Sequence, residues 1–388
     1  MIHPRGYKIK VYPTETQKVS INRAIEIYRA VFNTALDIQQ ENHRNGNKYI
    51  SFYTMEHEFS KLYKTDKYSW MREIPMSTVR EALADLDMAY KSFFKGLSRF
   101  PKYKSKKEYT KMIGARSERC RIVDNRIYIS GLGYLDGKNH NLSQNMRMYD
   151  TRLTFDGYDY WFTFTAETEM VDMTSIPKTD PVGIDVGIRN FATTSNGEVY
   201  QLSDVSKYQK RLRRQHKRLS RYYNRYLAES KRTTTKYEDI PKSNNMQKAL
   251  KQHHKTYSKI KNKLRTDIHT ITKQIVSKNP EAIVIEDIRV RELQKDKWFV
   301  KKNPYPYFFE FRRQITYKAE DRNIPVIIAD NNYPSSQICS RCGVQHKIYS
   351  NKLFICPNCG LRIDRDLNAA YNLRNLAYHQ TPTSISIA

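Results

Sequence analysis

Four of the five cysteines form two Cys-x-x-Cys pairs near the end of the chain: Cys339, Cys342, Cys356 and Cys359. Four thiolates suit the tetrahedral coordination of Zn²⁺, and a two-residue gap lets each pair bind one ion from a tight turn. Gly343 and Gly360 directly follow the pairs, where such a turn favours a residue without a Cβ. With four protein ligands the site would be closed, so the pattern predicts one structural zinc ion.

Two other interpretations of these cysteines exist: redox-active pairs, or pairs formed by coincidence. Zinc binding releases on the order of 10 kcal/mol in zinc-finger peptides, enough to hold together a loop too small to fold alone. We therefore favour zinc. The fifth cysteine, Cys120, is expected to be an ordinary buried thiol.

Three acidic residues stand within or beside buried elements. Asp185 lies inside VGIDVGI, Glu286 ends the apolar run AIVIE, and Asp366 opens the helical IDRDLNAAYNL. A charge in a buried strand costs several kcal/mol unless it is compensated, and metal ions compensate carboxylates. Carboxylates that converge from different elements can hold two Mg²⁺ ions for phosphodiester cleavage. Each acid alone could instead be a helix cap or ion-pair partner, as Asp287 and Asp364 could be.

The charge of the chain favours a polyanionic partner. Its 68 Lys and Arg exceed its 40 Asp and Glu, giving a formal net charge of +28 and a pI near 9.7. Nucleic acid is the leading candidate. An acidic membrane surface is the alternative, but no apolar run approaches the ~20 residues that span a bilayer. Because MIHPRGYKIKVYP has no apolar signal core, we expect the protein to act inside a cell.

The most basic segment, residues 207–265, has twenty Lys or Arg and three acidic residues. Its apolar positions predict two long helices packed on a sheet, separated by a polar loop over residues 231–245. A charge run is usually a solvated helix face. The excess of one sign favours a surface that faces phosphates, with these candidate contacts: Lys210, Arg213, Arg214, Lys217 and Arg218.

Hydrophobic patterning predicts a β-rich domain interrupted by helices. Residues 7–12 alternate as a strand, a capping box at Thr14 and Gln17 opens a helix, and residues 77–97 form another helix. Residues 103–167 carry hairpin signals, most strongly at Asp156-Gly157. The first strand is expected to join that sheet, so the helical module would be an insertion in a β-barrel-like domain. Residues 282–286 and 325–329 then predict two buried strands of a third region.

Taken together and in this order, GIDVGI, IVIED, the cysteine pairs and DRDLNAAYNL resemble the TnpB family encoded by insertion sequences, which is related to compact type V CRISPR effectors. The segments AYKSFF, FPKYK, RTDIH and PSSQICSRCG also fit. The resemblance runs from about residue 7 to residue 376. It implies an α+β multidomain fold: an RNase H-like RuvC nuclease core with an inserted zinc ribbon, plus a β-barrel wedge domain interrupted by a helical recognition domain.

The resemblance also implies domain limits, written here as expectations. They are a wedge domain over 1–12 and 101–176, a recognition domain over 13–100, a RuvC-like domain over 177–332 and 363–378, a zinc-ribbon module that binds target nucleic acid over 333–362, and a disordered tail over 379–388.

The activity implied by the resemblance is RNA-guided cleavage of double-stranded DNA beside a short flanking motif. Asp185, Glu286 and Asp366 would hold two Mg²⁺ or Mn²⁺ ions. Base pairing with the guide RNA would read the target, while the protein would follow backbones and read only the flanking motif. Arg80 is the candidate reader of that motif, and four lysines are candidate RNA contacts: Lys102, Lys104, Lys106 and Lys107. We expect one protein per RNA, in the cytoplasm and at the nucleoid of a prokaryote.

Three other functions stay open from the sequence. A CRISPR-associated relative would share the chemistry but use a separate crRNA, which the co-purified RNA would reveal. A non-cleaving RNA-guided repressor would be expected to lose an acid, and this chain keeps all three. A transposase performing strand transfer would be expected to carry a second catalytic module, and none is recognisable.

Overall fold

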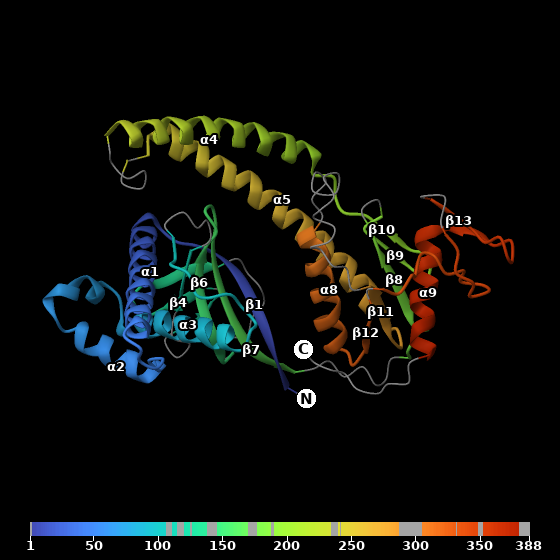
Figure 1. The fold of residues 1–388 in the computed structure, drawn as a ribbon, viewed down its shortest axis with the longest axis horizontal. Helices are drawn as coiled ribbons and strands as arrows, with labels where there is room; N and C mark the ends of the chain where they lie inside the picture. Colours follow the sequence, from blue (N-terminus) through green and yellow to red (C-terminus); the bar gives the residue numbers. More distant parts are fainter. Residues whose placement is uncertain are drawn as a thin grey trace. The chain divides into compact units, whose positions relative to one another are not determined.

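The computed structural model describes residues 2–105, 111–114, 120–124, 126–137, 146–169, 177–187, 190–233, 240, 242–286, 305–330, 332–347 and 352–379. The chain divides into two compact units, residues 1–169 and 170–388, and each is treated by itself (Figure 1). No helix in the described part of the chain is long and apolar enough to cross a membrane.

The helices of the first unit are α1 (Glu15–Arg44), α2 (Phe52–Leu62), the 3₁₀ helix η1 (Asp66–Glu73) and α3 (Met76–Phe94). The predicted capping box opens α1: Gln17 N donates to Thr14 Oγ1 at 3.3 Å, and Thr14 N donates to Gln17 Oε1 at 2.9 Å. Both α1 and α3 bury apolar residues at helical spacing, and together with the sheet they form the unit's core.

The sheet of the first unit has seven strands in the order β2-β6-β7-β1-β5-β4-β3. The strands are β1 (Ile2–Tyr12), β2 (Lys111–Gly114), β3 (Cys120–Val123), β4 (Arg126–Ile129), β5 (Gly133–Gly137), β6 (Met148–Phe155) and β7 (Tyr160–Glu169). Because β1 pairs with both β7 and β5, the prediction that the first strand joins this sheet is confirmed, and the helices are an insertion. In the described residues β2 and β3 do not pair, so closure into a barrel remains a prediction.

A mixed five-stranded sheet organises the second unit, in the order β10-β9-β8-β11-β12. The strands are β8 (Val182–Val186), β9 (Ala192–Thr194), β10 (Val199–Tyr200), β11 (Ile283–Glu286) and β12 (Val326–Ala329). The central strands β8, β11 and β12 run parallel, whereas β8, β9 and β10 form an antiparallel meander. The two inner parallel strands, β8 and β11, are buried on both faces, which explains their nearly continuous apolar sequences, whereas the edge strand β12 leaves Ile328 exposed.

Helices cover both faces of this sheet (Figure 1). One face packs against α5 (Asn244–Ser277) and α8 (Tyr305–Glu320) in a single apolar core. The other face packs against α9 (Arg365–His379), where Leu373 contacts Val284 and Ala329. Just before α9, β13 (Leu353–Ile355) and β14 (Arg362–Asp364) form a hairpin whose loop carries the second cysteine pair, and the first pair packs with it in one small core.

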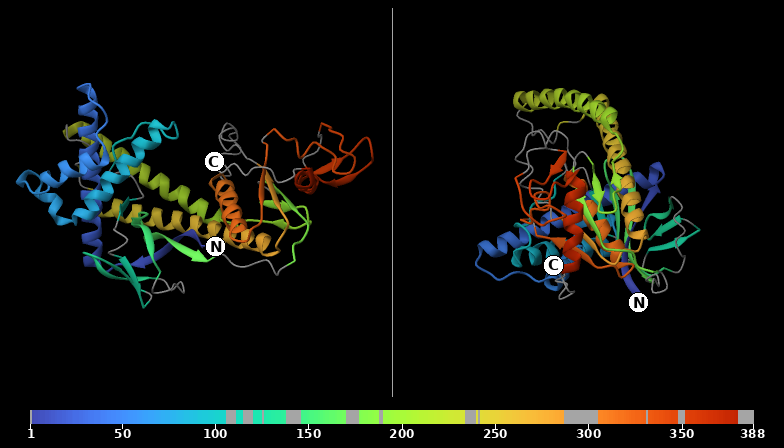
Figure 2. Two further views of the ribbon diagram at one scale, coloured as in Figure 1. Left: turned by 90° about the horizontal axis from the view of Figure 1, so that it is seen from below. Right: turned by 90° about the vertical axis from the view of Figure 1, so that its right-hand side faces the viewer.

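Helix α4 (Ser206–Thr233) packs along α5, and the left view of Figure 2 shows the two helices beside each other. The prediction of two long basic helices is therefore confirmed, but only α5 packs on the sheet, whereas α4 packs on α5. Only Leu219 and Tyr226 of α4 are buried, so its cationic side chains remain at the surface. Of the loop predicted over 231–245, residues 231–233 belong to α4 and 244–245 to α5, while 234–239 and 241 lie outside the described part of the chain. Of the tail predicted over 379–388, His379 is the last residue of α9, while 380–388 lie outside the described residues, as does Asp287.

Candidate functional site: an acid cluster and a cysteine cluster

Strand alternation places Asp185 on the α9 face of the mixed sheet. Val182, Ile184 and Val186 belong to the core formed with α5 and α8. Successive side chains of a strand point to opposite faces, so Gly183 and Asp185 point toward α9. A polar acid in an otherwise apolar strand therefore lies at a surface that only one helix covers.

Glu286 lies on the same face, beside Asp185. In β11, Ile283 and Ile285 belong to the α5–α8 core, while Val284 packs against α9. Strands β8 and β11 are parallel, with Ile285 opposite Ile184. The same register continued by one residue brings Glu286 next to Asp185, at the carboxyl ends of both strands.

Asp366 comes from the first turn of α9. Asp364 is the N-cap of that helix, because its Oδ1 accepts the backbone N–H groups of Asp366 at 2.9 Å and Leu367 at 3.1 Å. The interpretation of Asp364 as a cap is thus confirmed. The Asp364 carboxylate therefore caps the helix, whereas the Asp366 carboxylate does not and accepts a hydrogen bond from Asn190 instead.

Gly183 sets the distance between β8 and α9. A Cβ built on this residue would lie 2.1 Å from the backbone oxygen of Ala370 and 2.4 Å from the backbone nitrogen of Arg374. Moving from Gly183 to Asp185 advances about 6.6 Å along a strand. Moving from Ala370 back to Asp366 covers about 6 Å along a helix. Because the two distances are similar, the close contact at Gly183 brings Asp185 and Asp366 to the same height along the strand and the helix.

The three carboxylates influence one another electrostatically. Burial raises the pKa of Asp185 well above its ordinary value, the charges of Glu286 and Asp366 raise it further, and Arg365 partly opposes them. Burial also raises the pKa of Glu286, against a hydrogen bond from Ser335 that lowers it. Glu286 and Asp366 thus both disfavour the ionisation of Asp185, and three half-buried carboxylates of this kind form a ligand set that suits hard divalent cations.

Polar neighbours that the sequence did not point to hold two of these acids. Ser335 donates to Glu286 Oε1, and Asn190 Nδ2 donates to Asp366 Oδ2 at 3.3 Å. Arg365 Nη2 lies 3.3 Å from Asp366 Oδ1. The only sequence signal for them was position, since Ser335 lies in PSSQICSRCG and Asn190 closely follows GIDVGI.

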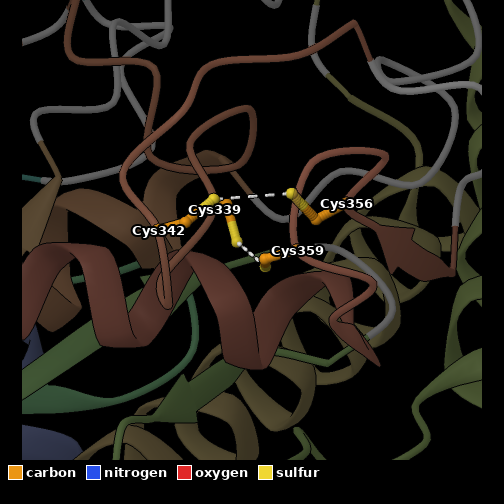
Figure 3. A group of neighbouring side chains, drawn as sticks. All are labelled: Cys339, Cys342, Cys356 and Cys359. Atoms are coloured by element: carbon orange, nitrogen blue, oxygen red, sulfur yellow. Dashed lines mark hydrogen bonds between the residues drawn. The ribbon is translucent and has the colours of Figure 1, made fainter.

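The cysteine pairs come together as predicted (Figure 3). Their four sulfur atoms all lie within 4.8 Å of one another, and no other group of His, Cys, Asp or Glu in the described residues is so closely spaced. The Sγ atoms of Cys339 and Cys359 are 3.6 Å apart, as are those of Cys342 and Cys356. Zn–S bonds of about 2.3 Å in a tetrahedron place sulfurs about 3.8 Å apart, so the cluster fits a zinc ion.

The turns of this site follow from its glycines. Gly343 and Gly360 adopt φ of +74° and +71°, and their N–H groups donate to Cys339 O and Cys356 O. The amides of Val344 and Asn358 donate to the Cys342 sulfur and lower its pKa to about 6, which favours the thiolate that binds metal. His346, whose Nε2 is 3.2 Å from Cys356 Sγ, was not predicted from the sequence. Cys120 is buried in the other unit, as expected.

The predicted nucleic-acid contacts fall into two groups. Five cations of α4 are exposed and form no ion pair with any described acid: Lys210, Arg213, Arg214, Lys217 and Arg218. Lys102 is also exposed, whereas Lys106 and Lys107 lie outside the described residues.

Arg80 and Lys104 are instead engaged within their own unit. Arg80 makes two contacts with Glu56, at 2.6 and 3.1 Å. The Lys104 ammonium lies 3.7 Å from Asp85 and 4.3 Å from the centre of the Phe32 ring. A side chain that already has a partly buried acidic partner would have to leave that partner to bind a phosphate, so nucleic-acid contact by these two residues remains a prediction.

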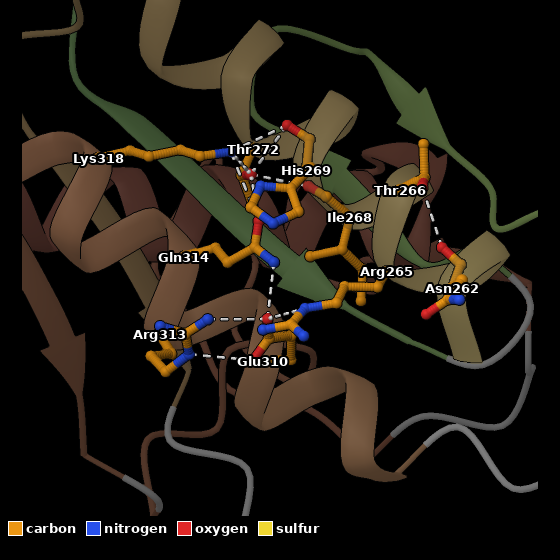
Figure 4. A network of polar contacts seen from close by, with 10 residues as sticks. All are labelled: Asn262, Arg265, Thr266, Ile268, His269, Thr272, Glu310, Arg313, Gln314 and Lys318. Carbon is orange, nitrogen blue, oxygen red and sulfur yellow. Dashed lines mark hydrogen bonds and ion pairs between the residues drawn. The ribbon is translucent and has the colours of Figure 1, made fainter. Parts of the chain in front are cut away.

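A polar network joins α5 and α8 on the far side of the mixed sheet (Figure 4). Glu310 accepts from Arg265 Nε at 3.2 Å and from Arg313 at 2.9 and 3.0 Å. These contacts, despite burial, lower the pKa of Glu310 to about 2. Lys318 Nζ donates to Thr272 Oγ1 at 2.6 Å in the same network. It holds together the two helices that support the face opposite the acids.

Three family models match the chain. A model described as "Probable transposase" matches residues 167–296, a "Helix-turn-helix domain" model matches residues 1–48, and a "Cas12f1-like, TNB domain" model matches residues 308–373. The first covers Asp185 and Glu286, and the third covers all four clustered cysteines and Asp366.

Curated relatives match over nearly the whole chain. "Putative RNA-guided DNA endonuclease InsQ" of Escherichia coli K12 is 28% identical over 95% of this chain and 91% of its own length. A "Putative RNA-guided DNA endonuclease" of Streptomyces pristinaespiralis is 25% identical over 95% and 88%. A solved Cas12f1–sgRNA–target DNA complex is 11% identical, with a TM-score of 0.46 over 96% of this chain and 99% of that one. These family models and relatives confirm the resemblance of the chain to the TnpB family.

Proposed function

We propose that this protein is an RNA-guided endonuclease of TnpB type, which cuts double-stranded DNA beside a short flanking motif by two-metal-ion hydrolysis. The observation that carries the proposal is the meeting of Asp185, Glu286 and Asp366 on one face of one sheet. The names of the full-length relatives support it. A mixed sheet with an acid on its central strand also supports an RNase H-like RuvC core.

The acids would hold two Mg²⁺ or Mn²⁺ ions, which when bound stabilise the attacking and leaving oxygens of the phosphodiester. Two ions in such a site lie about 3.5–4 Å apart, so carboxylates that come from three different elements can share them. Ser335 and Asn190 keep two of the carboxylates oriented.

The protein's own cations would bind the nucleic acids. Helix α4 presents eleven Lys and Arg against one acid, Glu229, and buries only two side chains. Such a surface attracts phosphates without reading bases. We assign it the backbone of a guide RNA or its duplex with target DNA, with one protein per RNA. The role of the zinc-ribbon module, residues 333–362, in binding target nucleic acid is part of the same proposal, as are the wedge and recognition domains within residues 1–176.

The proposal is tested by purifying the protein with its RNA, sequencing that RNA, and offering DNA that matches it. We expect cleavage only with Mg²⁺ or Mn²⁺, and we expect Asp185→Ala to abolish cleavage while target binding stays nearly intact. Wild-type cleavage rates in Asp185→Ala would refute the assignment of the acids. Binding without cleavage by the wild-type protein would favour the repressor, and a co-purified crRNA would favour the CRISPR effector.

A further inference from the structure

Each of the three acids has a neutral polar side chain beside it, and these neighbours come from different segments. Ser335 is 4% exposed and donates to Glu286. Asn190 donates to Asp366. Thr193 is the cross-strand partner of Asp185 in the β8–β9 pair.

Thr193 is the least expected of the three. Directly opposed residues of an antiparallel pair point to the same face, so its side chain accompanies that of Asp185 toward α9. It is 2% exposed, yet its hydroxyl has no hydrogen-bond partner among the described residues. A buried hydroxyl without a partner costs about 1–3 kcal/mol, so its retention needs a reason. A group bound between Asp185 and this hydroxyl would supply one.

Asn190 is held firmly in its place. The next residue, Phe191, is 3% exposed and contacts Phe308 and Phe311 of α8, with ring centres 5.9 and 5.2 Å away. Phe191 N also donates to Tyr200 O at 2.9 Å. With its neighbour fixed on both sides, the Asn190 amide can hold one oxygen of Asp366 while Arg365 contacts the other.

Ser335 is fixed from α9. Asn372 Nδ2 donates to the backbone oxygen of Ser335 at 2.7 Å and to that of Ile338 at 2.6 Å, and Asn372 is 2% exposed. The helix that carries Asp366 therefore also places the hydroxyl that holds Glu286. Neutral donors orient carboxylates without adding the charge that would compete with a bound cation.

We propose that Asn190, Thr193 and Ser335 are positioning residues of the acid cluster, one for each acid, and that they set its affinity for divalent cations. The inference rests on the proposed function, because it assigns these residues to the metal site of the nuclease. Thr193 would donate to Asp185 or to water bound with the cation, once the cation is present.

The test uses Mn²⁺ alone as the probe, added to the purified protein–RNA complex and followed by electron paramagnetic resonance. Binding that disappears in Asp185→Ala defines the site. We expect Asn190→Ala, Ser335→Ala and Thr193→Val each to raise the half-saturating Mn²⁺ concentration about tenfold. Target binding should stay within about twofold, and Thr193→Ser, which keeps the hydroxyl, should recover wild-type Mn²⁺ affinity.

Thr194→Val is the matched control, since Thr194 is equally buried on the same strand but points to the opposite face. Unchanged Mn²⁺ affinity in Asn190→Ala and Thr193→Val would overturn the inference, even if cleavage fell, because their role would then not concern the metal. A wild-type protein without Asp185-dependent Mn²⁺ binding would instead refute the proposed function itself.

Discussion

The cysteine cluster and the acid cluster solve opposite assembly problems. The four cysteines come from one short segment, in which turns at Gly343 and Gly360 shape the two pairs and the four sulfurs lie within 4.8 Å of one another. The acids come from β8, β11 and α9, so a sheet register and a close helix contact must form first. The comparison indicates that metal should build the first site, whereas the fold should build the second before any metal binds.

Breaking the cysteine cluster should have the largest effect. Zinc binding is worth on the order of 10 kcal/mol in small zinc domains, so Cys356→Ser should remove most of that stabilisation from residues 333–362. We expect the bound zinc to fall from one per chain toward none, measured by elemental analysis, with cleavage lost through misfolding. Cys120→Ser is the control, because that thiol lies outside the cluster and should leave the zinc content unchanged. Full zinc retention in Cys356→Ser would contradict a four-thiolate site.

The acid cluster should be most sensitive to a change that moves the backbone of α9 away from β8. In Gly183→Ala the new Cβ would meet backbone atoms of α9 that have little room to move. We expect a loss of about 3 kcal/mol in unfolding free energy. A helix displaced by about 1 Å should also slow cleavage about 100-fold. Chemical denaturation and single-turnover cleavage measure the two effects.

Gly6→Ala is the matched control for this change. Gly6 is also a strand glycine, but its Cβ would meet nothing within 4 Å. If both variants cut at the wild-type rate, the close contact of β8 with α9 does not position the acids.

Loss of a ligand should destabilise the cysteine cluster, which depends on its metal, but should stabilise the acid cluster when no metal is bound. Asp185→Asn removes one of three mutually repelling charges, so we expect the metal-free protein to gain about 1–2 kcal/mol in unfolding free energy while cleavage is lost. Thermal melting in excess EDTA tests this, and added Mn²⁺ should stabilise only the wild type. A less stable Asp185→Asn in EDTA would show that the carboxylates are already compensated by the fold.

Local signals made the cysteine cluster, the Thr14 capping box and the long basic helices predictable from sequence. Each depends on residues a few positions apart, so spacing alone carries the geometry. Predicting that the three acids meet required the family resemblance. The residues around Asp185 do not indicate that Glu286 will lie on the neighbouring strand. The order of the motifs along the chain, rather than the spacing of residues within them, indicated that these acids form one site.

Other features could not be read from the sequence at all. Thr193, Asn190 and Ser335 are common residue types, and only the strand pairing and the packing of α9 bring them to the acids. Arg80 and Lys104 were predicted as nucleic-acid contacts with the help of the family resemblance. Their partners Glu56 and Asp85 lie on other parts of the chain, so the ion pairs appear only once the helices pack.

The smallest expected effect comes from a change on the far face of the same sheet. It tests whether the acid cluster depends on contacts beyond its own face. Glu310→Gln removes a charge held by Arg265 and Arg313, both of which are partly exposed, so we expect a loss of about 1 kcal/mol. Since the pKa of Glu310 is lowered to about 2, its stabilising effect is present above pH 4.5 and fades as the pH falls toward 2. The melting temperatures of the variant and the wild type should therefore differ at pH 6 and converge near pH 2.

The Mn²⁺ affinity of Glu310→Gln should not change, because α9 and the strand register, rather than the α5–α8 network, bring the acids together. A loss of Mn²⁺ affinity in Glu310→Gln would show that both faces of the sheet are needed to assemble the site.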